Sequence, residues 1–378
     1  MDIELLVADI IKKQCSVLQL IESLQPDLTS TKIEQRAGAI GEVANVLQKL
    51  PPAHLNEQEV TTLVQFLCVK LADHFSVSSH AIFGLKALCS CVNLSNAAAE
   101  AVFRSVTTEL QVQTLNQMER MAVYQIFQLL LQNKLHFLKS INHDFVFGFV
   151  RTIDAEKDPR NLLIVFELFP LVVAEFDITR FSEDMFEVIA CYFPVDFKPS
   201  ASGSVTRDQL VELHSRCLSS TPIFGEFMVP LLLEKLASDL RSARLESFNL
   251  LRRAAPVYPA AVLLGYGQQL LAAFRRAMFR SAVSDEERRV ALTAFAEVVA
   301  RIARSDCDAG DDAESGREEF FRLLLKECRP NLRELDPNVM EATGRALESA
   351  VGVADATTRR QLVTGILPDI LAGLADRK

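Results

Sequence analysis

The chain has 378 residues, of which 49% are hydrophobic and 24% charged. This apolar content excludes a disordered chain, and the small number of glycines, 14, argues against collagen-like and turn-rich all-β architectures. A net charge of −9 argues against a general polyanion-binding surface. Asp2 and Glu4 open the N-terminal segment, so we expect no signal peptide. Eight scattered cysteines indicate free thiols in a reducing compartment.

Apolar residues recur at helical spacing along nearly the whole chain, and the strict alternation of half-buried strands is hard to find. Two clear stripes consist of Leu162, Val165, Phe166, Phe169 and Val173, and of Leu292, Phe295, Val299 and Ile302. The pattern predicts an all-α fold. The longest uncharged stretch, 254–274, contains two prolines and two glycines, which favours a helix-turn-helix over a membrane span.

Polar turn positions recur at a nearly constant interval. They are Asp27, Asp73, Asn116, Asp158, Asp196, Asp239, Asp285 and Asp336. Intervals near 40–47 residues, each holding two helix-length segments, are typical of paired-helix repeats. We therefore predict one continuous α-solenoid over 1–378, built from about eight or nine HEAT/armadillo-like helix pairs, with loops at 198–205 and 305–316.

Motifs that would indicate catalysis are missing. The sequence has no phosphate-binding G-x-x-x-x-G-K-[ST] loop, no G-x-G-x-x-G, no G-x-S-x-G and no H-E-x-x-H. We therefore expect neither an enzyme nor a bound cofactor or metal. One alternative stays open, a cluster-binding or catalytic use of Cys68, Cys89 and Cys91, although packing as small buried side chains is favoured.

One basic segment stands out in this acidic chain. Its candidate partner-binding residues are Arg241, Arg244, Arg252, Arg253, Arg275, Arg276 and Arg280, with Glu246 as the one acid among them. On one surface of a repeat array they would bind acidic partner segments. The alternative, which we favour slightly, is that they cap helix C-termini or pair with acids across the stack. The run FVFGFV at 145–150 predicts a buried helix, because its aromatic residues fall on all sides.

Several segments together go beyond a generic repeat. They are GLKALCSCVNL at 84–94, DFVFGFVRTIDAEKDPRNLLIVFELF at 144–169, FEVIACYFPVDFKP at 186–199 and TPIFGEFMVPLLLEKLASD at 221–239. The set resembles the N-terminal region of the HEAT-repeat family named for yeast sensitivity to methyl methanesulfonate, its nineteenth member. The resemblance spans about residues 15–280.

This resemblance implies a scaffold of the cytosolic iron–sulfur protein assembly targeting complex, which delivers clusters to DNA repair and replication enzymes and supports excision repair and transcription. Its implied partners are the other subunits of that complex and the iron–sulfur client proteins, with no direct nucleic acid and no membrane. The implied location is the cytoplasm and the nucleus. The alternative is a nuclear-transport-type or phosphatase-scaffold HEAT protein, which would bind basic peptides.

Overall fold

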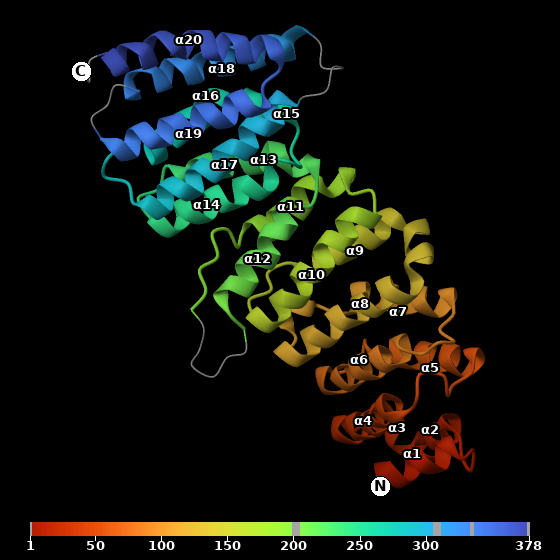
Figure 1. Cartoon of the computed structure of the whole chain (residues 1–378). Helices are drawn as coiled ribbons and strands as arrows, with labels where there is room; N and C mark the ends of the chain where they lie inside the picture. The colour runs from red at the N-terminus through yellow and green to blue at the C-terminus, as the bar shows by residue number, and fades with distance from the viewer. Residues whose placement is uncertain (1, 199–204, 305–310, 333–335, 376–378) are drawn as a thin grey trace. The chain divides into compact units, whose positions relative to one another are not determined.

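The computed structural model describes residues 2–198, 205–304, 311–332 and 336–375. These residues form twenty α-helices and three short 3-10 helices and contain no strand, which confirms the all-α prediction (Figure 1). Contacts divide the chain into an N-terminal unit, 1–188 with 200–210, and a C-terminal unit, 189–199 with 211–378. The single continuous array therefore stays a prediction, and each unit is described by itself.

The N-terminal unit stacks its helices in two rows. One row holds α4, α6, α8 and α10, and the other holds α5, α7 and α9 (Figure 1). The helices are α1 (Ile3–Ile11), α2 (Val17–Ser23), α3 (Gln25–Leu28), α4 (Ile33–Lys49), α5 (Glu57–Lys70), α6 (Phe75–Cys89), α7 (Asn96–Glu109), α8 (Gln117–Ser140), α9 (Asn142–Ile153) and α10 (Pro159–Glu175), with 3-10 helices at Val112–Thr114 and Thr179–Phe181. The helices α11 (Ser182–Ala190) and α12 (Arg207–Leu218) cross the division between the units.

The C-terminal unit repeats this plan. One row holds α14, α17 and α19, and α13, α16, α18 and α20 form the other. The helices are α13 (Gly225–Leu236), α14 (Arg241–Ala254), α15 (Ala260–Gly265), α16 (Gly267–Met278), α17 (Asp285–Ala303), α18 (Asp311–Asn331), α19 (Pro337–Val353) and α20 (Ala356–Ala375), with a 3-10 helix at Pro222–Phe224. Stacked helix pairs of this kind are the α-solenoid that the turn interval predicted.

Half of the eight predicted turn residues start helices, among them Asp285 as the first residue of α17. Asn116, Asp158 and Asp336 are the N-caps of α8, α10 and α19, and each accepts hydrogen bonds from backbone N–H groups of the first turn. Pro159 occupies the first position of α10, where its missing N–H costs no hydrogen bond. Asp73 and Asp239 lie in turns two residues before α6 and α14, and Asp196 lies in the non-helical segment after α11. Only Asp27 falls inside a helix, the short α3.

The apolar stripes face the core. Phe295, Val299 and Ile302 of α17 are fully buried, and Phe166 and Phe169 of α10 are at most 1% exposed. Within the FVFGFV run, Phe145 and Phe149 are buried as predicted. Phe147 differs, since half of it is exposed. It packs instead on the surface against Phe181 and under the guanidinium of Arg151.

Five helices carry an arginine at their fourth position, and we call these the fourth-position arginines. They are Arg36, Arg120, Arg244, Arg288 and Arg359. Each guanidinium donates to backbone carbonyls of the chain segment just before its own helix, for example Arg36 to Ser30 O in the turn, and Arg359 to Val351 O at the end of α19 and to Ala354 O. These bonds fix the entry of the chain into the helix.

Three of these arginines also reach the next helix pair. Arg36 binds the carboxylate of Asp73 through Nε and Nη2, at 2.9 and 2.7 Å. Arg244 binds Glu287 in the same two-pronged way, at 2.6 and 3.0 Å. The partners lie 37 and 43 residues apart, one repeat along the chain. Such forked pairs define both the distance and the angle between neighbouring repeats.

The third pair lies at the EKDPRN turn and is the most buried. The Glu156 side chain is inaccessible to solvent and accepts two hydrogen bonds from Arg120, at 2.8 and 2.9 Å. It also accepts from the hydroxyl of Tyr124, the amide of Asn161 and the backbone N–H groups of Lys157 and Asp158. This turn is therefore architectural.

The CYFPVDF segment at 191–197 follows α11 and is anchored through the backbone of Val195. The N–H of Val195 donates to the buried carboxylate of Glu246, at 2.8 Å. Nearby, the buried His214 ring donates from Nε2 to Ile189 O, at 2.9 Å. Burial disfavours the charged imidazolium and lowers the pKa of His214 to about 4, although the hydrogen bond to Ile189 opposes this.

The two predicted loops fall mainly on residues outside the described part of the chain, 199–204 and 305–310. For the second loop, the predicted end at residue 316 is wrong, because α18 begins at Asp311. Within the ranges given above, none of the helices has the length and apolar content to cross a membrane.

Candidate protein-interaction site

The seven arginines of the basic segment do not form one surface. Arg241 and Arg244 belong to the first turn of α14, whereas Arg252 and Arg253 lie in its last turn. Eight residues of helix separate Arg244 from Arg252, a rise of about 12 Å. In Figure 1 the turns from α13 to α14 and from α16 to α17 lie together at one end of the C-terminal unit, and the second half of α14 runs away from that end. The segment therefore divides between two places.

Four of the seven arginines pair with acids across the stack, as the favoured alternative predicted. Their pairs are Arg241 with Glu286, Arg244 with Glu287, Arg253 with Glu212, and Arg275 with Glu327. Only the second pair is largely buried, with 6% of the Glu287 side chain exposed. The other three contribute little to stability, because exposed ion pairs are screened by water and salt.

The remaining arginines, Arg252, Arg276 and Arg280, differ. Among the described residues, no hydrogen bond or ion pair engages their guanidinium groups. Arg252 is exposed in the last turn of α14. Arg276 and Arg280 lie at the C-terminal end of α16 and line the same cavity.

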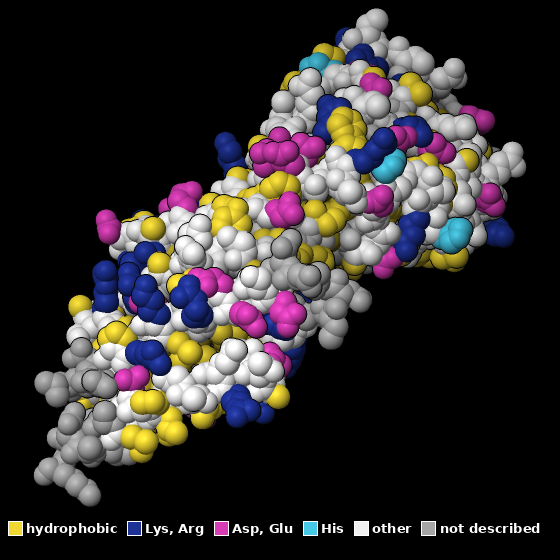
Figure 2. Space-filling view, turned by 90° about the horizontal axis from the view of Figure 1, so that it is seen from above, with side chains coloured by type: hydrophobic (Ala, Val, Ile, Leu, Met, Phe, Trp, Pro, Cys, Tyr) yellow, Lys and Arg dark blue, Asp and Glu magenta, His cyan; other side chains and the backbone are white. Residues whose placement is uncertain are grey.

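This cavity, which we call the arginine cavity, has a volume of about 290 Å³. Its charged lining consists of Arg244, Arg276, Arg280, Asp239 and Glu287. Apolar side chains contribute the rest of the wall, among them Leu236, Phe248, Ala273, Ala277 and Val283. All of these residues belong to the C-terminal unit. Figure 2 shows a group of Lys and Arg side chains in its left half, and further Lys and Arg side chains over the right half of the view.

Some of the charged side chains in the arginine cavity have a partner of opposite charge and others do not. Arg244 donates to both oxygens of Glu287 and, through Nη1, to the carbonyls of Ser238 and Asp239. The hydrogen bonds from Arg244 to Glu287 are the main cause that raises the pKa of Arg244. Because this pair is neutral overall, Arg276 and Arg280 bring two positive charges to the cavity against the single carboxylate of Asp239.

Helix capping does not occupy these two arginines. The end of α16 is capped by Arg288, whose side chain is buried and reaches back from α17. Its Nη1 donates to Met278 O, and its Nη2 donates to Arg280 O and Val283 O. Arg288 lies outside the basic segment that the sequence predicts, because that segment ends at residue 280. The signal that could have found it is its place, four residues after the N-cap Ser284.

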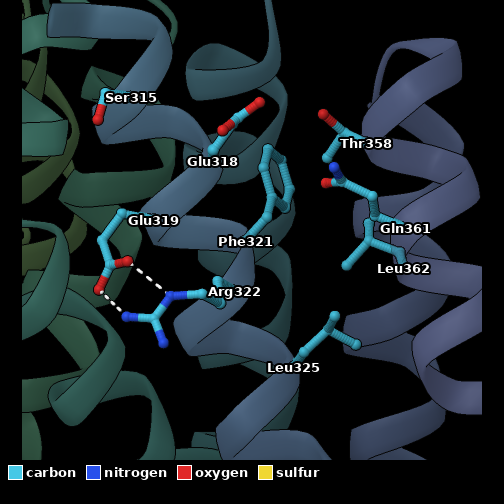
Figure 3. A pocket seen from close by; sticks show the side chains of 9 residues that line it. All are labelled: Ser315, Glu318, Glu319, Phe321, Arg322, Leu325, Thr358, Gln361 and Leu362. Carbon is cyan, nitrogen blue, oxygen red and sulfur yellow. Dashed lines mark hydrogen bonds and ion pairs between the residues drawn. The ribbon is translucent and has the colours of Figure 1, made fainter.

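A second hollow, of about 410 Å³, lies between α18 and α20 (Figure 3). Phe321 and Leu325 of α18 face Thr358, Gln361 and Leu362 of α20 across it. Its most prominent charges, Glu319 and Arg322, pair with each other through two hydrogen bonds. α20 also carries exposed apolar side chains at helical spacing, namely Val363, Leu367, Ile370 and Leu371.

The three cysteines of the cluster-binding alternative are poorly suited to hold a metal. Burial raises the pKa of Cys91 to about 11, and it also raises the pKa of Cys68 and, further, that of the fully buried Cys89. Metal ligation needs the thiolate, which these environments disfavour. Within the described part of the chain, no group of three or more His, Cys, Asp or Glu side chains is arranged to hold a metal ion.

Solved structures resemble the chain only distantly. A crystal structure of importin beta aligns with a TM-score of 0.40 at 10% identity, over 95% of this chain and 45% of that one. A structure of the Pds5-Scc1 complex aligns with a TM-score of 0.35 at 12% identity, over 91% of this chain and 66% of that one.

Curated relatives are much closer in sequence. The chain is 35% identical over 367 residues to the MMS19 nucleotide excision repair protein homolog of Homo sapiens, which covers 96% of this chain and 35% of the relative. It is 33% identical over 366 residues to the homolog of Danio rerio, covering 95% of this chain and 34% of that protein. The Drosophila melanogaster protein is 31% identical over 92% of this chain. The chain thus spans about a third of the length of these relatives.

A protein family matches residues 21–280 directly. It is the N-terminal MMS19 family, described as Dos2-interacting transcription regulator of RNA-Pol-II. The match covers the EKDPRN turn, the CYFPVDF segment and most of the arginine cavity. Together with the relatives above, it shows that the chain belongs to the MMS19 family.

Proposed function

We propose that the chain is a non-catalytic scaffold that binds other proteins along its helix rows and works in nucleotide excision repair. The names of its relatives support the repair assignment. The observation that carries the scaffold role is that the buried charged side chains pair with each other between neighbouring repeats. The buried Glu156 and Glu287 each pair with an arginine of the preceding repeat, so these charges hold neighbouring repeats together rather than serve chemistry.

We further propose that the chain acts with the subunits of the cytosolic iron–sulfur targeting complex and contacts iron–sulfur client proteins, in the cytoplasm and the nucleus. In this role the clusters are cargo that passes between partner proteins. A helix-pair stack suits it, because many weak contacts along an extended surface sum to a useful affinity.

The test is affinity capture from cell extract with quantitative mass spectrometry. The baits are this chain, a full-length relative, and an unrelated helix-repeat protein of similar net charge as the control. We expect this chain to enrich excision-repair proteins or iron–sulfur enzymes of DNA metabolism at least several-fold over the control bait. Enrichment by the full-length relative alone would contradict a client-binding role for these repeats. Enrichment of importin cargo or of basic peptides instead would favour the nuclear-transport alternative.

A further inference from the structure

We propose that the arginine cavity binds an acidic, extended segment of a partner protein, with one side-chain carboxylate held between Arg276 and Arg280. This inference rests on the scaffold role proposed above and names the chemistry of one partner.

The first support is the unused hydrogen-bonding capacity of the two arginines. A guanidinium offers five N–H donors in a planar fork that matches a carboxylate. Among the described residues, nothing accepts a hydrogen bond from the side chain of Arg276 or Arg280, although Arg276 is partly buried. By contrast, their neighbours Arg244 and Arg275 both bind glutamates of the stack.

The second support is that the fold does not need these charges. Cations at a helix C-terminus ordinarily stabilise its free carbonyls. At α16, however, the buried Arg288 already donates to Met278 O and Arg280 O. The charges of Arg276 and Arg280 are therefore available for a partner.

The third support is the wall of the cavity. Phe248 and Ala277 are at most 4% exposed and line it together with Leu236 and Val283. An apolar wall excludes water from part of the site, and a charge pair beside it is screened less than one on an open surface. A carboxylate held there gains more than it would at an isolated surface arginine such as Arg252.

The charge count favours a peptide carboxylate over a polyphosphate or a nucleic acid. Asp239 and Glu287 both line the cavity. These carboxylates repel a ligand that concentrates several negative charges, whereas one carboxylate balances the local excess of positive charge. The net charge of −9 on the whole chain adds to that repulsion.

The inference is tested by fluorescence anisotropy on the full chain. The probe is a labelled twelve-residue peptide of alternating Glu and Ser, and the matched control peptide has Gln in place of Glu. We expect the Glu peptide to bind at least tenfold more tightly than the Gln peptide, and to weaken several-fold as salt rises from about 50 to about 300 mM. Equal binding of the two peptides, or no binding of either, overturns the inference.

Variants then locate the binding. We expect Arg276→Gln and Arg280→Gln each to weaken the Glu peptide about tenfold, the value of one charge-assisted hydrogen-bonded contact. The matched control is Arg252→Gln, which removes an unpaired arginine from the far end of α14 and should change affinity less than twofold. If a Gln variant fails to fold, Arg276→Glu and Arg276→Lys replace it. We expect Arg276→Glu to lose binding of the Glu peptide and Arg276→Lys largely to retain it. Equal effects at Arg252 and Arg276 contradict the assignment.

Competitors separate the ligand classes. Inositol hexakisphosphate and a twelve-nucleotide single-stranded DNA are each added to displace the labelled Glu peptide. If either displaces it at a lower concentration than unlabelled Glu peptide does, the assignment to a protein segment is overturned. The experiments distinguish a failure of the arginine-cavity proposal from a failure of the scaffold proposal. Partners captured equally by the wild-type chain and by Arg276→Gln/Arg280→Gln, with no peptide binding, refute the cavity alone. Peptide binding that the Gln variants weaken, with no partner captured from extract, refutes the scaffold role alone.

Discussion

Replacing Glu156 by Gln should destabilise the N-terminal unit strongly. The carboxylate accepts six hydrogen bonds, two of them from Arg120, which is itself 17% exposed. A neutral amide of the same shape leaves the Arg120 charge without its partner. It also places an NH₂ group, which is itself a donor, against the groups that donate hydrogen bonds to the Glu156 carboxylate. Breaking a buried pair in this way costs about 3–5 kcal/mol, a large share of the stability of a typical domain.

The variant is compared with Glu100→Gln, which removes an exposed partner of Arg104 and should cost less than about 0.5 kcal/mol. Urea unfolding followed by circular dichroism gives the global loss of free energy. Hydrogen exchange read by mass spectrometry shows where it occurs, with α8 and α10 exchanging faster and α17 unchanged. A loss below about 1 kcal/mol for Glu156→Gln, or faster exchange spread evenly over both units, would refute the reasoning.

The effect should also depend on pH. Burial acts to raise the pKa of Glu156, but the hydrogen bonds from Arg120, from the backbone of Asp158, from Asn161 and from Tyr124 outweigh it and hold the pKa below its ordinary value of 4.5. A carboxyl whose pKa is lower in the folded state contributes stability above 4.5 and loses it as the pH falls. The difference between wild type and Glu156→Gln should therefore shrink below pH 4.5.

Three further predictions concern other buried positions. The pKa of His214 is lowered from 6.5 to about 4, so acidification from pH 6.5 to 4 should lower the free energy of unfolding by about 3 kcal/mol through this residue. Urea titrations at several pH values measure this loss, and a His214→Gln variant should not show it. Gly148→Ala should cost about 1–3 kcal/mol in thermal unfolding, because an added Cβ would lie 2.8 Å from Phe103 Cζ, a buried ring; an unchanged melting temperature would contradict this. Arg244→Gln should cost about 3 kcal/mol in urea unfolding, since it leaves the Glu287 carboxylate buried without its cation, and a loss under about 1 kcal/mol would count against a structural pair.

The helices could be predicted from the sequence because their signals are local. A stripe such as Phe295, Val299 and Ile302 repeats every three or four residues, and all three side chains are buried. The caps Asn116 and Asp158 act on backbone N–H groups two or three residues away. Such signals hold whatever the rest of the chain does, and the recurring interval between turns then implies stacked pairs.

The candidate site could be predicted only in part, because it depends on contacts between distant residues. Seven arginines that are close in sequence divide between the two ends of α14 and the end of α16. Whether Arg244 is free depends on Glu287, 43 residues later, and whether Arg276 is needed as a cap depends on Arg288 in the next helix. Neither relation is visible in a count of charges.

The fourth-position arginines have a consequence for how the chain can vary in length during evolution. A guanidinium such as that of Arg36 or Arg120 is placed by counting from the start of its own helix, while the acid that it binds lies 37 or 36 residues away, and for Arg244 43 residues away. The ion pair between repeats therefore tolerates a difference of several residues in the length of the chain between the arginine and its acid. An insertion in the three residues that precede such an arginine within its helix would rotate it away from both partners. Natural length variation among homologous chains should accordingly concentrate in the connections between helix pairs and avoid the first turn of α4, α8 and α14.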